Sequence, residues 1–203
     1  MRYAGDDPEV REGLVTAPYP GLRLAWTEVE ASPERTPREL RDRLRAAADR
    51  IRGADVIELR RREVPHAYRV FFRHLGIEPD EVPTPVEAVV QRRLRHGGLP
   101  PQGLVEDALT IAVLETGVGL WAFDAARLEG DLSLRARAEG DDPGGPLVIA
   151  DAAGPVAVLF EPPGPRAAVT RATTRIALAA VAPPGVSDLS VQEALWTAWD
   201  ILA

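Results

Sequence analysis

Apolar and polar residues alternate in several short stretches of this chain, and the pattern predicts strands. Residues 22–29 alternate in the way typical of a half-buried strand. Residues 132–138 alternate strictly, which indicates a strand with one face in water. Three further short apolar runs, bounded by Gly, Pro or Asp, are also predicted to be strands: 146–151, 156–160 and 175–181.

Helix-start signals occur three times. Thr36-Pro37-Arg38-Glu39 and Thr84-Pro85-Val86-Glu87 each place Thr at an N-cap, Pro at the first helical position and an acid that closes a capping box. Ser190-Val191-Gln192-Glu193 predicts the same device for a C-terminal helix. Two more helices are predicted over 65–75 and 104–116.

This order of elements predicts the fold class. Helices dominate the first half of the chain, strands follow without intervening helices, and one helix ends the chain. Consecutive strands of this kind favour antiparallel pairing, so we expect an α+β fold. The sequence shows no internal repeat and no low-complexity linker, and we therefore expect one domain over residues 1–203.

Composition narrows the chemistry. The chain has 203 residues, of which 45% are hydrophobic and 27% charged, and it has no cysteine. Disulfide scaffolds, thiolate zinc sites and cysteine nucleophiles are therefore excluded. No apolar run approaches the roughly 20 residues that a membrane span needs, and the first residues lack the pattern of a signal peptide. We expect a cytoplasmic protein that does not bind membranes.

The charge is unevenly distributed. The net charge is −7, yet residues 60–98 contain eight arginines against five acids, and residues 162–187 contain three arginines and no acid. Such arginine runs are either solvated helix faces or a surface for phosphate, whose oxygens match guanidinium groups. On the second interpretation the candidate RNA-binding residues are Arg69, Arg73, Arg92, Arg93 and Arg95.

The usual catalytic and cofactor motifs are missing from the sequence. A standard P-loop needs a lysine, and the chain has none. His66, His74 and His96 lack metal-ligand spacing, and no Gly-x-Ser-x-Gly elbow is present. We therefore expect neither a metal nor a cofactor. Trp121 fits either a pocket wall or the core, and Asp124 fits a turn.

Residues 95–141 carry a more specific pattern. The segments in question are Gly98-Leu99-Pro100-Pro101, Val105-Glu106-Asp107, Leu114-Glu115-Thr116-Gly117, Ala122-Phe123-Asp124, Leu128-Glu129-Gly130 and Glu139-Gly140-Asp141. In order and spacing this run resembles the B3/B4 domain of the bacterial phenylalanyl-tRNA synthetase beta subunit. That domain hydrolyses tyrosine wrongly esterified to tRNA for phenylalanine. The resemblance covers about 60 residues closely and about 140 loosely.

The resemblance implies a fold and an activity. It implies helices packed on a curved, mainly antiparallel sheet, with an N-terminal strand–helix portion over 1–60 and the core motif region over 61–203. It also implies tRNA or aminoacyl-tRNA as the partner, and deacylation of mischarged tRNA in trans rather than ligation. Trp121 stands where the family has His, so a pocket here should favour a less polar amino-acid side chain.

The resemblance also suggests site residues. Thr110 stands at the position of a family Asn, and together with Glu161, as a carboxylate that orients water, it is the catalytic candidate. The substrate-binding candidates are Trp121, Asp124, Thr173 and Thr174. Two alternatives remain open: a non-catalytic module that binds tRNA or another RNA through the arginines above, and a pocket for a free amino acid or small metabolite.

Overall fold

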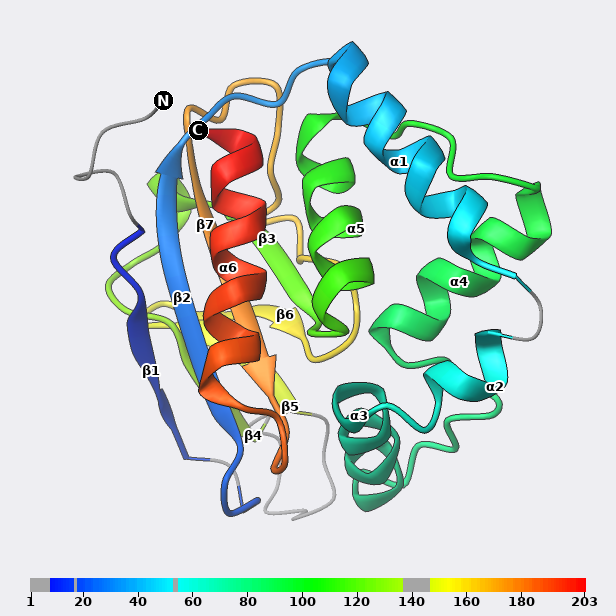
Figure 1. The fold of residues 1–203 in the computed structure, drawn as a ribbon. Helices are drawn as coiled ribbons and strands as arrows, with labels where there is room; N and C mark the ends of the chain where they lie inside the picture. The colour runs from blue at the N-terminus through cyan, green and yellow to red at the C-terminus, as the bar shows by residue number, and fades with distance from the viewer. Residues whose placement is uncertain (1–7, 17, 53–54, 137–146) are drawn as a thin grey trace.

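The computed structural model describes residues 8–16, 18–52, 55–136 and 147–203. These residues form an α+β fold in which six helices pack on a curled sheet of seven strands (Figure 1). The helices are α1 (Arg38–Arg50), α2 (Asp55–Leu59), α3 (Glu63–His74), α4 (Pro85–His96), α5 (Leu104–Thr116) and α6 (Asp188–Leu202). The strands are β1 (Arg11–Val15), β2 (Arg23–Glu30), β3 (Leu120–Asp124), β4 (Ser133–Ala136), β5 (Leu147–Asp151), β6 (Gly154–Val158) and β7 (Arg175–Ala182).

The sheet has the strand order β3-β7-β2-β1-β4-β5-β6. Among the described strands the pairing of β1 with β4 is parallel, and the other neighbours are antiparallel. The predicted α+β class is therefore confirmed. β2, from the N-terminal portion, pairs with β7 along all eight of its residues. The two predicted portions, 1–60 and 61–203, therefore both contribute strands to the same sheet.

β7 lies between β3 and β2, second from one edge of the sheet, and both of its faces are buried. Ile176, Leu178 and Ala180 join a cluster formed with α3, α5 and α6. The intervening residues, Ala177 and Ala179 among them, join a second cluster inside the curl of the sheet. This burial on both sides explains why residues 175–181 form an uninterrupted apolar run in the sequence.

The helices form two layers over one face of the sheet. α5 and α6 lie side by side and contact β3, β2 and β7 (Figure 1). α1 and α4 pack on α5, on its side away from α6, around Leu40, Leu44 and Ile111. None of the helices in the described ranges is long and apolar enough to cross a bilayer.

The predicted helix starts have three different outcomes. The capping box at Thr84–Glu87 is confirmed. The predicted box at Thr36 is wrong, because Pro37 is the N-cap and the Thr36 hydroxyl instead donates to Asp107 Oδ2 over 2.5 Å. The predicted start of the last helix is one turn too late, since the N-cap is Ser187, whose Oγ accepts a bond from the Ser190 amide.

The predicted strands are mostly found. β2, β4, β5 and β7 lie within or close to the predicted ranges, although residues 137–138 and 146 fall outside the described residues. The strand predicted over 156–160 begins two residues earlier and ends at Val158, because Leu159 and Phe160 enter a turn. β1, β3 and α2 were not predicted.

Candidate functional site

A cavity of about 660 Å³ lies beside β3, between α4, α5 and the loop that joins β6 to β7. Its volume is in the range of small-ligand pockets. Most of its lining is apolar, with Phe72, Leu109 and Val169 among the contributors. Gly119 fits the wall closely, because a Cβ at this position would lie 2.8 Å from Pro85 Cγ. The start of α4 can therefore approach β3 without filling the cavity.

Arg92, on α4, is the basic side chain among the described residues that line this cavity. It is half-buried, and its Nη atoms donate to the Gln102 side chain and to Thr110 Oγ1. Its Nε is buried and lacks a hydrogen-bond partner within the described residues. Burial lowers the pKa of Arg92, and the charge of Asp107 opposes part of this effect. Within the described residues Arg92 thus forms no ion pair, and it lines a mostly apolar cavity.

Thr110 lies on the same wall and is buried. Its hydroxyl donates to the Glu106 carbonyl, one helical turn back, over 2.8 Å and accepts a bond from Arg92 Nη2 over 2.9 Å. These two bonds fix the position of the Arg92 guanidinium. The predicted catalytic role of Thr110 stays a prediction, and in this structure the hydroxyl positions Arg92.

Trp121 and Glu161 meet at the opposite wall. The buried indole donates from Nε1 to the Glu161 carbonyl over 3.0 Å, which holds the loop after β6 against β3. The side chain of Glu161 is exposed at the rim of the cavity. The sequence allowed Trp121 to be either a pocket wall or a core residue. In the structure it is both, since it lines the cavity and packs in the core cluster inside the sheet. The cavity brings together Thr110, Trp121 and Glu161 from the predicted set.

The other predicted substrate-binding residues lie outside the lining of this cavity. Asp124 and Thr173 are buried and bond to each other, with Thr173 Oγ1 donating to Asp124 Oδ2 over 2.8 Å. Asp124 also accepts a bond from the Ala126 amide, as expected of a turn residue. Thr174 is exposed, and its carbonyl accepts a bond from the Ala31 amide. These residues anchor the segment that leads into β7.

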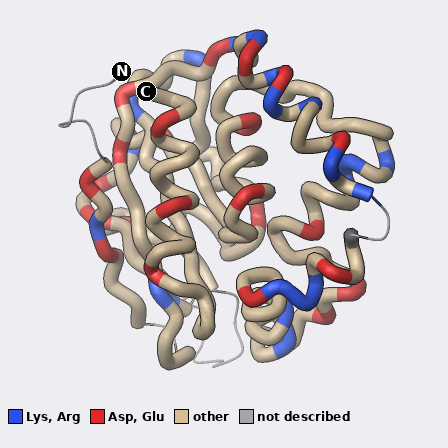
Figure 2. Tube along the Cα trace, in the orientation of Figure 1, with Lys and Arg blue, Asp and Glu red and all other residues tan. Residues whose placement is uncertain are grey.

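The predicted RNA-binding arginines have different environments. Figure 2 shows that basic positions recur along α1 to α4 with acidic positions between them. Arg93 donates from Nε to the Ala48 carbonyl over 2.9 Å, and Arg92 lies in the cavity wall. Arg73 and Arg95 are exposed. Within this set, Arg73 and Arg95 have the freest access to a phosphate.

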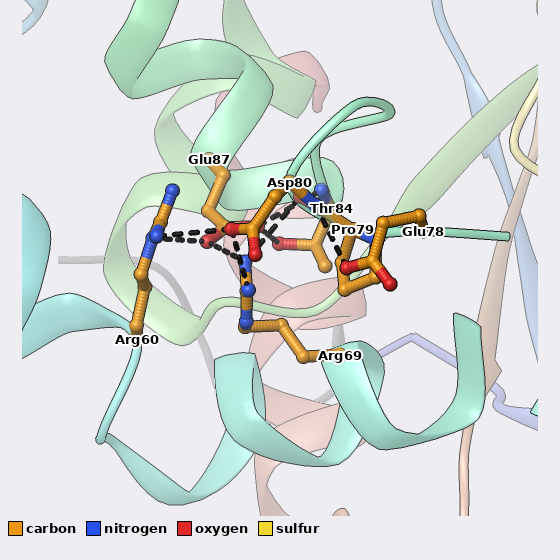
Figure 3. Close-up of polar contacts among 7 residues, drawn as sticks. All are labelled: Arg60, Arg69, Glu78, Pro79, Asp80, Thr84 and Glu87. Carbon is orange, nitrogen blue, oxygen red and sulfur yellow. Dashed lines mark hydrogen bonds and ion pairs between the residues drawn. The ribbon is translucent and has the colours of Figure 1, made fainter. Parts of the chain in front are cut away.

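Arg69 is buried in an ion-pair network that joins α3 to the start of α4 (Figure 3). Its Nη atoms lie 2.8 Å from Glu87 Oε1 and 2.8 Å from Asp80 Oδ1. Arg60 also pairs with Glu87 over 3.1 Å. The hydrogen bonds and charges of Asp80 and Glu87 outweigh burial, so the pKa of Arg69 is raised. Because this guanidinium is engaged internally, its role in the structure is to hold the two helices together.

A second cavity, of about 950 Å³, was not predicted from the sequence. It lies between the segment before α1, the start of α5 and the turn at 169–171, and three arginines line it: Arg35, Arg41 and Arg171. Glu106 and Val169 line both cavities. The one sequence signal for it was the basic stretch at 162–187, which contains Arg171.

Among the described residues no three His, Asp or Glu side chains gather closely enough to hold a metal ion. Comparison with known families adds no identity: no family model matches the sequence, and a search of curated proteins returns no match.

Proposed function

We propose that this chain is a relative of the B3/B4 editing domain and hydrolyses mischarged aminoacyl-tRNA that carries an apolar amino acid. The observation that carries the proposal is the cavity of about 660 Å³ that gathers Thr110, Trp121 and Glu161 around Arg92. The sequence predicts the first three as catalytic or substrate-binding residues. Their convergence on one cavity supports a common ligand.

The lining of the cavity favours a particular substrate. An apolar amino-acid side chain gains free energy when it leaves water for a surface formed by residues such as Leu109, Val113 and Phe160. The indole of Trp121 commits its N–H to the Glu161 carbonyl. It therefore offers a substrate hydroxyl no donor, and we expect the enzyme to discriminate against polar side chains.

The charged residues support the hydrolytic step. A water oxygen attacks the ester carbonyl carbon, the bond from that carbon to the ribose oxygen breaks, and the ribose oxygen takes the proton that the attacking water loses. Negative charge develops on the carbonyl oxygen, and we assign its stabilisation to Arg92, the basic residue in the described lining of the cavity. We assign the orientation of the water to the carboxylate of Glu161, which lines the same cavity and is exposed. Thr110 contributes by holding the guanidinium of Arg92.

A panel of mischarged aminoacyl-tRNAs tests this proposal directly. We expect faster deacylation of esters of apolar amino acids than of polar ones. Arg92→Gln should reduce kcat by about 100-fold, the loss typical of removing one donor to an oxyanion. Arg45→Gln, at an exposed residue outside the cavity, is the matched control and should leave the rate unchanged. Hydrolysis no faster than the spontaneous reaction for every ester would overturn the proposal.

A second candidate function rests on the unpaired charge of Arg92. Within the described residues this guanidinium forms no ion pair. The carboxylate of a free amino acid or small metabolite could therefore form an ion pair with it. A ligand that binds only the folded protein raises the melting temperature. A thermal-shift screen with free amino acids would favour this candidate if apolar amino acids raised the melting temperature of the wild type but not of Arg92→Gln. Binding of RNA without any deacylation would instead favour a non-catalytic module.

A further inference from the structure

The two cavities are neighbours. Glu106 and Val169 contribute to the lining of both. Gln102 lines the second cavity, and its side chain accepts a hydrogen bond from Arg92 in the wall of the first. The two cavities therefore lie next to each other and share part of their walls.

The second cavity is more polar than the first. Arg35, Arg41 and Arg171 are its basic residues. All three side chains are exposed, and within the described part of the chain none has a hydrogen bond or an ion pair. Some other arginines of this protein are paired with a carboxylate, as Arg43 is with Glu115. The carboxylates in this cavity, Glu34 and Glu106, leave the arginines in excess.

Buried bonds hold the segments that carry these arginines. Thr36, next to Arg35, donates its hydroxyl to Asp107 Oδ2 over 2.5 Å. The turn that carries Arg171 is closed by Thr173, whose amide donates to the Thr170 carbonyl and whose hydroxyl donates to Asp124. Both anchoring pairs are buried. The arginines thus project from fixed backbone, so little conformational freedom of the backbone is lost when an anion binds.

We infer that the second cavity binds the phosphodiester backbone of the single-stranded 3′ end of an RNA, with Arg35, Arg41 and Arg171 on its phosphates. The bound strand leads its terminal nucleoside toward the apolar cavity. Guanidinium groups match phosphate oxygens in geometry and charge. Three unpaired guanidinium groups that line one cavity suit successive phosphates of a strand better than a single anion. The inference rests on the proposed function for the occupant of the first cavity. It assigns RNA binding to residues other than those predicted on α3 and α4.

The experiment measures binding of an uncharged RNA hairpin with and without a single-stranded 3′ extension. Fluorescence anisotropy over a series of salt concentrations gives Kd for the wild type and for a triple variant, Arg35→Gln, Arg41→Gln and Arg171→Gln. We expect the wild type to prefer the extended hairpin and the triple variant to lose that preference. The slope of log K against log salt should become shallower by about 2, since each lost contact to a single strand contributes roughly 0.7.

A second triple variant controls for net charge. Arg45→Gln, Arg61→Gln and Arg62→Gln remove the same charge from exposed residues that line neither cavity, and this variant should keep the preference for the extension. Equal weakening in both triple variants, or a wild type that ignores the extension, would overturn the inference.

Deacylation assays on the same proteins separate the two proposals. If no ester is hydrolysed but the extension is bound through the three arginines, RNA binding by the second cavity is supported and the proposed hydrolytic function is contradicted. If esters are hydrolysed and the first triple variant binds RNA and hydrolyses esters like the wild type, only the inference about the second cavity is contradicted. Equal melting temperatures of the three proteins establish that both variants fold.

Discussion

Phe160 adopts a backbone conformation that usually belongs to glycine. Its φ is 68°, and it occupies the third position of a turn closed by the Glu161 amide and the Val158 carbonyl over 3.0 Å. For a bulky residue this region costs about 1–2 kcal/mol. The ring packs against four other aromatic rings, with that of Phe72 the nearest at 4.4 Å between centroids. Packing of the ring thus offsets a strained backbone in the wall of the candidate site.

Two substitutions at this position separate strain from packing. Both Phe160→Ala and Phe160→Gly lose the aromatic contacts, which should destabilise the protein by about 2 kcal/mol because the ring is only half-buried. Glycine also relieves the backbone strain, so we expect Phe160→Gly to be the more stable of the two by about 1 kcal/mol. Urea denaturation measures both values. An alanine variant as stable as the glycine variant would show that the turn is not strained.

At the scale of elements, a buried ion pair joins α3 to α4. The side chains of Arg69 and Glu87 are 8% and 3% exposed and lie 2.8 Å apart, and Glu87 also closes the capping box of α4 through the Thr84 amide (Figure 3). Pro85 and Ala88 of the same helix turn line the apolar cavity. The pair therefore fixes one wall of the candidate site.

A double-mutant cycle measures this pair. Glu87→Gln should keep the cap but remove the buried one of the two carboxylates that pair with Arg69, at a cost of about 3 kcal/mol. Combining it with Arg69→Gln should cost at least about 1 kcal/mol less than the sum of the single variants. Asp80→Asn is the control, since that side chain is 57% exposed and should contribute less than about 1 kcal/mol. Additive losses on chemical denaturation would mean that the two side chains act independently.

The elements also show which structural features the sequence could predict. The cap at Thr84 was predictable because both partners lie within four residues. The cap at Thr36 was not, because Asp107, far along the chain, takes its hydroxyl. β3 was missed because a five-residue apolar strand lacks the alternation that marks β2. Hydrogen bonds between residues a few positions apart were predictable. A hydrogen bond to a residue far along the chain, such as that from Thr36 to Asp107, was not.

The same distinction applies to the candidate site. Residue type and the resemblance selected Trp121 and Glu161, and the fold brings both to one cavity. The second cavity was missed because its arginines come from segments that only the tertiary structure brings together, so no spacing in the sequence relates Arg35 to Arg171. Arg92 was selected for RNA on helical spacing alone, and its burial against Thr110 could be seen only in the fold.

At the scale of the whole molecule, the loop from β6 to β7 crosses between the two parts of the curled sheet and forms one wall of each cavity. Arg166 ties this loop to the end of β5, with Nη atoms 2.7 and 2.9 Å from the Asp151 carboxylate oxygens. Burial alone would raise the pKa of Asp151. The hydrogen bonds from Arg166 and from backbone amides nevertheless hold it below the usual value of 3.8.

This ion pair predicts a loss of stability in acid. Below a pH of about 4 the unfolded chain binds a proton at Asp151 more readily than the folded protein does, so the free energy of unfolding falls as the pH falls. Asp151→Asn removes this contribution. The variant should be less stable than the wild type by about 2 kcal/mol at neutral pH, and the difference should shrink as the pH falls toward the lowered pKa.

Urea denaturation between pH 7 and pH 3 tests this, with Asp42→Asn as a control that removes an exposed carboxylate on α1. That control should follow the wild-type pH dependence. Because the loop also carries Phe160, Glu161 and Arg171, protonation of Asp151 should weaken ligand binding over the same range of pH. A stability difference between Asp151→Asn and the wild type that stayed constant down to pH 3 would mean that Asp151 holds the loop by hydrogen bonding alone, without a contribution from its charge.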